Sequence, residues 1–256
     1  MGARLAPAPT GGQSTAALRY DPPMPRTTRL PDDQRESLRQ KLLGQVPSWY
    51  RPWAHLAVPA LFGLGIIAVA AALAREVTAG EWLTVPSALI LLNAGEWSIH
   101  KYLLHHRTPP LQLLYDRHTP QHHMVFVTED MAMRQTREWR LVLIPAWGIV
   151  GAFLVALPIP ALLHLLGQSN AGLLFIATAM AYVLTYEWLH LAYHLSPASP
   201  IGRNPLIARL RRHHATHHSP ELMQRWNFNV TLPLWDLVRG TIYRGEAGRG
   251  PAISSD

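Results

Sequence analysis

The chain has 256 residues, of which 48% are apolar and only 15% charged, and its formal net charge is +7. A soluble domain usually carries about a quarter charged residues, so this deficit indicates long uncharged segments. The absence of cysteine excludes disulfides, iron–sulfur clusters and thiolate metal sites, whereas 14 histidines are far more than ordinary usage.

The N-terminal segment is polar and rich in proline and arginine. It lacks the short apolar core and the small-residue cleavage site of a secretion signal. We therefore expect residues 1–45 to form a disordered cytosolic tail, with helix only near Asp32–Leu43. Residues 46–245 are expected to form one membrane domain, and residues 246–256 a flexible C-terminal tail.

Four apolar segments follow the tail: Ala54–Leu73, Trp82–Leu104, Leu141–Leu166 and Ala171–Leu195. Each approaches or exceeds the ~20 residues that cross a hydrocarbon core ~30 Å thick. The short connections within the first pair and within the second pair predict two helical hairpins. The predicted fold class is therefore all-α, an integral membrane protein with four transmembrane helices.

Basic residues are distributed unevenly around these segments. Of the 23 basic residues, eight precede the first segment, five lie between Arg107 and Arg140, and eight follow the fourth segment, whereas only Arg75 lies near the opposite side. The positive-inside rule then predicts that both termini and the central loop are cytosolic. Arginines that flank apolar segments favour contact with anionic lipid over nucleic acid. The arginine-rich composition is typical of GC-rich bacterial genomes, which favours the bacterial inner membrane.

The histidines gather at the cytosolic ends of the apolar segments, because an even number of crossings brings them to one side. Neutral imidazole suits iron, zinc, copper or nickel, and polar side chains at membrane depth are usually functional. Ten rings give two ions five ligands each, and six-coordination would leave one position on each ion for oxygen or water. We therefore predict a cytosolic helical cap with a dimetal site. Its candidate ligands are His100, His105, His118, His122, His123, His190, His194, His214, His217 and His218.

The spacing of these histidines predicts local structure. His190 and His194 are four residues apart and therefore share a helix face. His100 and His105 are five apart, and five residues of an ideal α-helix rotate by about 140°, so the two rings would diverge. Either the helix ends between them or it carries a π-bulge.

A helix start is predicted in the central loop. Thr119 and Pro120 have the residue types of an N-cap and a first helical position. His122 and His123 would then lie in the first turn of that helix.

Two carboxylates are candidate partners for the metal-bound rings. Glu96 and Glu187 each precede a ligand by about one helical turn, and a metal-bound histidine generally needs a partner for its other ring nitrogen. Both are predicted second-shell residues, although they could instead satisfy buried polar groups. Among the remaining histidines, His55 and His164 are expected to be structural, whereas ligation by His106 or His213 is left open.

Four histidine motifs, taken in order, resemble the fatty acid hydroxylase superfamily, which includes sterol desaturases, methylsterol oxidases and carotenoid hydroxylases. The resemblance runs from about Glu96 to Tyr243. The motifs are His100-Lys-Tyr-Leu-Leu-His105, His118-Thr-Pro-Gln-His122-His123, His190-Leu-Ala-Tyr-His194 and His214-Ala-Thr-His217-His218. The resemblance implies an integral-membrane oxygenase with these ten histidines as ligands of two iron ions, which zinc can replace in a purified form. It also implies an external electron-transfer protein, such as a ferredoxin.

The favoured function is hydroxylation of an unactivated C–H bond of a lipid, with dioxygen and external electrons. Desaturation of a lipid, sterol or carotenoid is the alternative within the same family. A histidine-rich membrane metal transporter or metal-binding protein is the alternative of another class. Transporters often place ligands near the bilayer midplane between related halves, whereas these histidines gather at one surface.

Overall fold

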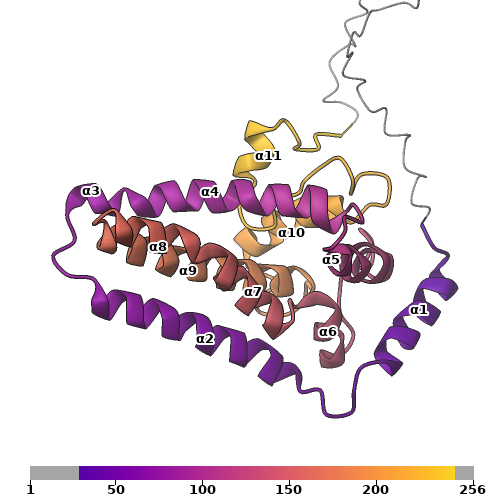
Figure 1. The fold of residues 1–256 in the computed structure, drawn as a ribbon. Coiled ribbons are helices and arrows are strands. Elements are labelled where there is room, and N and C mark those ends of the chain that lie inside the picture. Colours follow the sequence, from indigo (N-terminus) through magenta and orange to yellow (C-terminus); the bar gives the residue numbers. More distant parts are fainter. Residues whose placement is uncertain (1–28, 246–256) are drawn as a thin grey trace, which may run out of the picture.

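The computed structural model describes residues 29–245 (Figure 1). Within this range the chain forms helices, and its one β-bridge, between Val127 and Asp130, is isolated. The predicted all-α class is confirmed. The helices in chain order are α1 (Asp32–Gly44), α2 (Pro52–Leu73), α3 (Ala79–Trp82), α4 (Thr84–Ile99), η1 (His100–Leu104), α5 (Gln112–Arg117), η2 (His118–His123), η3 (Thr136–Glu138), α6 (Trp139–Val142), α7 (Ala146–Ala156), α8 (Pro158–Leu165), α9 (Ser169–Tyr193), α10 (Pro205–His217) and α11 (Leu234–Val238). The predicted C-terminal tail, 246–256, lies outside the described residues.

Three helical segments are long and apolar enough to cross a membrane: Pro52–Leu73, Thr136–Leu165 and Ser169–Tyr193. They correspond to the first, third and fourth predicted segments. At 1.5 Å per residue, the 22 residues of α2 reach about 33 Å, which matches a hydrocarbon core of ~30 Å. The second predicted segment contains α4, whose 16 residues lie between the short helices α3 and η1.

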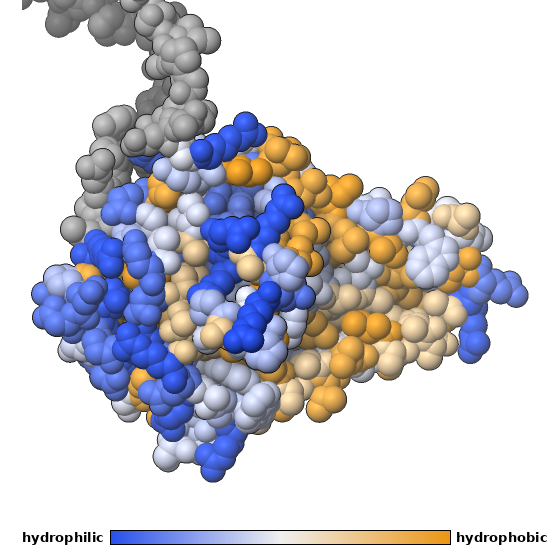
Figure 2. All heavy atoms as spheres, turned by 180° about the vertical axis from the view of Figure 1, so that it is seen from behind, coloured by the Kyte–Doolittle hydropathy of each residue, from blue (hydrophilic) through white to orange (hydrophobic). Residues whose placement is uncertain are grey.

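These helices expose apolar side chains on the outer surface of the molecule. Only 17% of the most apolar window of α2 is buried, and Leu61, Leu64 and Val69 are among its exposed side chains. Figure 2 shows the same division on one face of the molecule, with hydrophilic residues gathered at one end and hydrophobic residues over much of the other. A soluble monomer rarely exposes so much contiguous apolar surface, so this distribution is that of an integral membrane protein.

Helix α9 is the central helix, and α2, α4 and α8 pack against it (Figure 1). Two glycines permit the close approach. A Cβ atom added to Gly172 would lie 2.9 Å from the carbonyl oxygen of Pro160, and one added to Gly63 would lie 2.9 Å from Leu184 Cδ1. Small residues at these crossings bring helix backbones together, as they do in other membrane bundles.

The predicted N-terminal tail divides at residue 29. Residues 1–28 lie outside the described residues, whereas α1 is a folded helix close to the one expected near Asp32–Leu43. Leu42 of α1 is buried in a cluster with Val125, Phe126 and Trp139. The polar composition of this helix is misleading as a sign of disorder, because its arginines are buried in ion pairs instead of being solvated. The predicted domain boundaries themselves stay a prediction.

A buried ion pair fixes α1 to the segment that follows η2. The Arg39 side chain is 1% exposed and its Nη1 donates to Glu138 Oε2 at 2.6 Å, while the Glu138 side chain is 0% exposed. Arg39 also donates to the carbonyl oxygen of Val125 at 3.4 Å, and its guanidinium lies over the Phe126 ring. Helix α1 therefore braces the chain between residues 125 and 138.

We predict that Arg39→Met destabilises the protein by about 3–5 kcal/mol, because it leaves the Glu138 carboxylate buried and unpaired. The measurement is the thermal unfolding midpoint of purified protein in detergent. The double variant Arg39→Met/Glu138→Leu should recover part of the loss, because it removes both charges. The matched control is Arg134→Gln, which breaks the ion pairs of an exposed arginine with Glu36 and Asp130 and should cost less than Arg39→Met, about 1 kcal/mol. Equal losses in Arg39→Met and Arg134→Gln would contradict the bracing role.

Candidate metal centre

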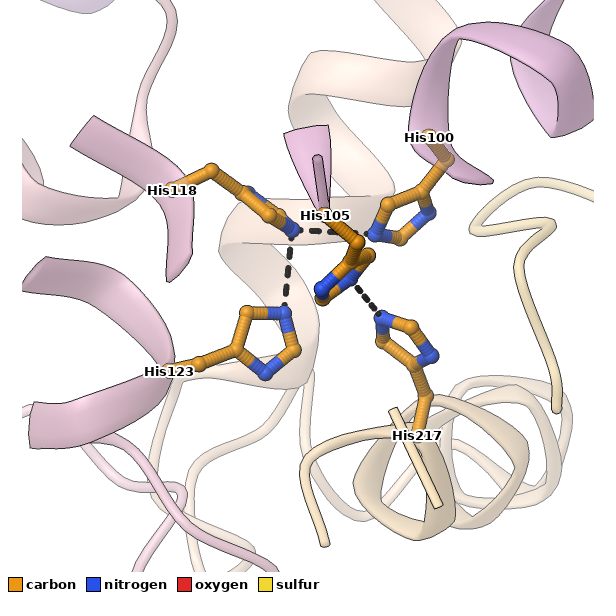
Figure 3. Close-up of side chains that lie close together, drawn as sticks. All are labelled: His100, His105, His118, His123 and His217. Atoms are coloured by element: carbon orange, nitrogen blue, oxygen red, sulfur yellow. Dashed lines mark hydrogen bonds between the residues drawn. The ribbon is translucent and has the colours of Figure 1, made fainter. Parts of the chain in front are cut away.

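All ten candidate histidines meet in two groups of five, and within each group the ligand atoms lie within 4.8 Å of one another. We call these groups the pentads. The first pentad is His100, His105, His118, His123 and His217, and the second is His122, His190, His194, His214 and His218. Figure 3 shows the five rings of the first pentad converging from separate segments of the chain. The structure thus brings together every residue that the sequence selected as a ligand.

Two His-His pairs connect the pentads. His123 belongs to the first pentad and His122 to the second, and His217 and His218 divide in the same way. Consecutive residues on a helix point about 100° apart, so each pair directs one ring into each pentad. The two groups are therefore neighbours, and one of the stacked ring contacts between them, His123 with His218, has centroids 4.2 Å apart.

The predicted irregularity between His100 and His105 is confirmed. Residues His100–Leu104 form the π-helix η1, which follows α4 directly and ends at His105. A π-helix has an i→i+5 repeat, so residues five apart come onto one face. Both rings consequently enter the first pentad, with centroids 5.1 Å apart.

The predicted helix start at Thr119 is wrong. The chain is already helical from Gln112, and His118–His123 continue it as a second π-helix, η2, with Pro120 inside. The Thr119 hydroxyl does not cap a helix but donates to the carbonyl oxygen of Leu104 at 2.7 Å. It therefore joins η2 to the end of η1.

The hydrogen bonds of the rings turn lone pairs toward each other in the first pentad. A neutral imidazole has one N–H. His217 Nδ1 donates to the carbonyl oxygen of Trp226 at 2.8 Å, and His105 Nδ1 donates to the Thr119 hydroxyl at 3.2 Å, because that hydroxyl gives its own proton to Leu104. The Nε2 atoms of His105 and His217 therefore both carry lone pairs, although they lie 2.9 Å apart. Such an arrangement needs a cation or a proton between the two nitrogens.

In the second pentad too, hydrogen bonds on the outer side fix two inner ring nitrogens as acceptors. His218 Nδ1 donates to the carbonyl oxygen of Phe126 at 2.6 Å, and His194 Nδ1 donates to that of Met131 at 2.8 Å. Their Nε2 atoms are thus acceptors. Within the described residues, His194 Nε2 is buried without a hydrogen-bond partner, and His218 Nε2 lies 3.0 Å from His214 Nε2.

Protonation is a poor solution in either pentad. Burial, assisted by the neighbouring rings, holds the pKa values of His194, His217 and His218 well below the ordinary value of 6.5. The other solution is a metal cation bound between the rings, and the spacing of the ring nitrogens fits such an ion. Two nitrogens ~2.1 Å from one ion and at right angles to each other lie about 3.0 Å apart, and neighbouring Nε2 atoms within the pentads lie 2.9–3.2 Å apart. The residues of each pentad therefore fit one metal ion.

Backbone carbonyls, rather than carboxylates, accept from the outer ring nitrogens. Besides the carbonyls of Trp226, Phe126 and Met131, that of Leu141 accepts from His122 at 3.0 Å and that of Phe228 accepts from His100. Such partners fix the tautomer and the orientation of a ligand ring. Sequence reasoning missed them, because every residue type offers a carbonyl.

The predicted second-shell carboxylates do not contact the rings. Glu96 accepts hydrogen bonds from the amide and hydroxyl of Thr231 at 3.1 and 2.6 Å, from the Val230 amide and from the Tyr182 hydroxyl. Glu187 accepts from the Ile144 amide at 2.8 Å. Both carboxylates thus accept from buried polar groups, which was the alternative, although Glu187 Oε2 is buried without a hydrogen-bond partner among the described residues.

Asp236 holds the segment that supplies two of the carbonyls. Its carboxylate accepts from the Phe228 and Asn229 amides at 2.9 and 2.8 Å and from His213 Nε2 at 3.1 Å. Burial alone would raise the pKa of Asp236, but the hydrogen bonds from His213, a hydroxyl and two amides lower it, so the carboxylate stays charged. Asp236 thereby positions the carbonyls of Trp226 and Phe228, which face the first pentad.

The remaining histidines lie outside both pentads. His213 contacts Asp236, and His106 Nδ1 lies 2.8 Å from the carbonyl oxygen of Lys101, so the two histidines left open belong to neither pentad. His55 bonds to the carbonyl oxygen of Ile144 at 3.0 Å, and His164 to the Ser169 hydroxyl at 2.9 Å. Both have the structural contacts expected of them.

An apolar cavity of about 550 Å³ opens beside the pentads. Its walls come from α4, α7, α8 and α9, with Leu91, Val155 and Ile159 among the lining side chains. One end is formed by rings of both pentads, including His118 and His190. A long apolar molecule in this cavity would therefore reach both candidate metal positions.

We predict that each pentad binds one metal ion, so that the loaded protein holds two ions per chain. His217→Ala removes a ligand from the first pentad and His194→Ala from the second, and each change should lower the content to about one ion, since the loss of one of five ligands weakens binding by roughly 100-fold or more. The measurement is elemental analysis after dialysis. His164→Ala, outside both pentads, should keep two ions, and two ions in either ligand variant would contradict the assignment.

We also predict that the metal-free protein loses thermal stability as the pH falls from about 7.5 to about 5.5. The folded pKa values of the pentad rings outside the membrane helices lie below 6.5, so the unfolded chain takes up protons first. Stability is thus highest above the unfolded pKa and falls below it, by about 1.4 kcal/mol per pH unit for each proton. Thermal midpoints of chelated and metal-loaded protein provide the comparison, and the loaded form should change less. A metal-free midpoint that stays level or rises on acidification would refute the prediction.

Comparison with known proteins gives one match. A family model described as fatty acid hydroxylase matches residues 85–241. No curated protein and no solved structure gives a significant match. The matched range covers more than half of the chain and includes both pentads, Asp236 and most of the cavity wall. The chain belongs to the fatty acid hydroxylase family.

Proposed function

We propose that this protein is a membrane-bound di-iron oxygenase that hydroxylates an unactivated C–H bond of a lipid. The observation that carries the proposal is the shared wall of the two pentads and the apolar cavity. Inward lone pairs select a cation, and an apolar cavity selects an apolar molecule, so the two together favour oxidation of a hydrocarbon. Membership of the fatty acid hydroxylase family supports the same reaction class.

The first pentad would hold one ion and the second pentad the other. When bound, two iron ions would supply the activation of dioxygen that C–H oxidation requires, while the protein supplies binding, orientation and electrostatics. Zinc is an alternative occupant in a purified form, because all-imidazole sites accept several ions. The backbone carbonyls keep the rings oriented, and the apolar lining excludes water from the reacting carbon.

The proposal includes four membrane crossings. Helix α4, extended by α3 and η1, would be the fourth span beside the three long helices. With four spans, the ends of α4 and α9 that carry histidines face the same side as η2 and α10. The basic residues that flank these ends favour the cytosolic side, in a bacterial inner membrane.

The reaction needs electrons from outside the site. One oxygen atom enters the C–H bond to give an alcohol, and two electrons and two protons reduce the other atom to water. We propose that a separate electron-transfer protein, ferredoxin-like or similar, supplies these electrons. Removal of a second hydrogen instead of oxygen insertion would give an alkene, which is the desaturase alternative at the same site.

We predict oxygen-dependent conversion of lipid by iron-loaded protein in liposomes with a chemical reductant. Mass spectrometry of the lipids under isotopically labelled dioxygen should detect products that gain one labelled oxygen atom. His217→Ala should lower the rate by roughly 100-fold or more, because it removes a ligand of the first pentad. His164→Ala is the control and should retain the rate of the unmodified chain.

Other outcomes separate the alternatives. Products that lose two hydrogens and gain no oxygen would favour desaturation. Metal uptake into sealed vesicles without oxygen consumption would replace the oxygenase with a transporter. Turnover that survives His217→Ala would overturn the catalytic assignment of the pentads.

A further inference from the structure

The cavity wall carries one positive charge that no carboxylate neutralises within the described residues. Its charged lining residues are Glu96 and Arg117. The Glu96 carboxylate is occupied by four hydrogen bonds from Tyr182, Val230 and Thr231. Arg117 makes one hydrogen bond, from Nη2 to the carbonyl oxygen of Arg140 at 3.2 Å, and that acceptor is neutral. Most of the guanidinium donors are left for another partner.

Two exposed arginines, Arg107 and Arg134, differ from Arg117 because each has a carboxylate partner. Arg107 pairs with Asp116 at 2.8 Å, and Arg134 pairs with Asp130 at 3.1 Å as well as with Glu36. An arginine beside apolar surface normally gains a counter-charge, because desolvating an unpaired charge is costly. The unpaired charge of Arg117 therefore indicates an anionic partner that comes from outside the chain.

Arg117 lies at the metal end of the cavity. It directly precedes His118 of the first pentad, and Gln121, one helical turn later, adds an amide to the same wall beside His122 of the second pentad. The lining of α9 runs from Phe175 to His190, a span of roughly 22 Å at 1.5 Å per residue. The cavity is thus long and mostly apolar, and Arg117 and Gln121 lie next to the pentads.

We propose that Arg117, assisted by Gln121, binds the anionic end of an acyl lipid, a carboxylate or a phosphate, whose chain occupies the cavity. The inference rests on the proposed function and names its substrate class. A guanidinium matches both anions through paired N–H donors, which an alcohol cannot use in the same way. In this orientation the carbons near the polar end of the lipid face the pentads, and the distant end of the chain lies among α7, α8 and α9. Oxidation should therefore occur close to the polar end.

The test is equilibrium binding to metal-loaded protein in nanodiscs of zwitterionic lipid, with empty nanodiscs subtracted. The probes are radiolabelled palmitate, hexadecyl phosphate and hexadecanol, which share one chain and differ in the polar end. The unmodified chain should bind at least one of the two anions about tenfold more tightly than the alcohol, which is 1.4 kcal/mol. Preference for palmitate identifies a fatty acid as the source of the anion, and preference for the phosphate identifies a phospholipid.

Arg117→Gln should abolish the preference for the anion and leave hexadecanol binding unchanged, whereas Arg117→Lys should keep part of the preference. Arg107→Gln is the matched control, since Arg107 is exposed, pairs with Asp116 and is not part of the cavity wall. Equal binding of acid, phosphate and alcohol by the unmodified chain would overturn the inference. A similar loss for all three probes in Arg117→Gln would do so as well, because it would mean that the side chain only supports the wall.

Metal content and oxygen-dependent turnover, measured on the same preparations, separate this inference from the proposed function. If the unmodified chain shows no anion preference while its metals and turnover are intact, only the role of Arg117 is overturned. Retained preference without metal binding or turnover overturns only the oxygenase. The metal content of the Arg117 variants also verifies that they are folded.

Discussion

The site depends on one electrostatic constraint: imidazole lone pairs are forced toward each other by hydrogen bonds on the opposite side of the rings. Five backbone carbonyls accept from outer ring nitrogens, and the inner nitrogens then face common centres. Without a cation this arrangement is repulsive, and burial opposes its relief by protonation. Metal binding and the folding of η1, η2 and α10 around the centre are consequently linked, because each makes the other favourable.

Each pentad has its own support on its outer side. Asp236 holds the segment whose carbonyls, at Trp226 and Phe228, orient rings of the first pentad. Arg39 of α1 holds the segment after η2, whose carbonyls at Phe126 and Met131 orient rings of the second. The supports come from opposite ends of the described chain. The His-His pairs of η2 and α10 contribute to both pentads, so the two supports act on the same helices.

Sequence patterns predicted well which histidines gather and predicted their surroundings poorly. Histidine motifs are local, so the ten rings could be selected by type and spacing, and the five-residue spacing of His100 and His105 indicated either a helix end or a π-bulge. The carbonyl acceptors have no residue signature, and so Glu96 and Glu187 were given a role that the backbone performs. The helix start predicted at Thr119 was wrong because the Thr119 hydroxyl donates to the carbonyl oxygen of Leu104 instead of capping a helix. The burial of α1 was hidden because its apolar residues are few and its arginines pair with residues about ninety positions away.

The helices that line the cavity also carry apolar side chains on the outer surface of the molecule. Leu91 and Val155 line the cavity and are also among the exposed apolar residues that a bilayer would cover. In the proposed function, a lipid would thus pass from the bilayer to the pentads along apolar surface, without crossing water. The pentads, Arg117 and Gln121 lie at the end of that path, where they offer partners to a polar end group. An apolar path that ends in polar groups orients an amphipathic molecule before any chemistry takes place, because the reversed orientation would bury the polar end among hydrocarbon side chains without a partner.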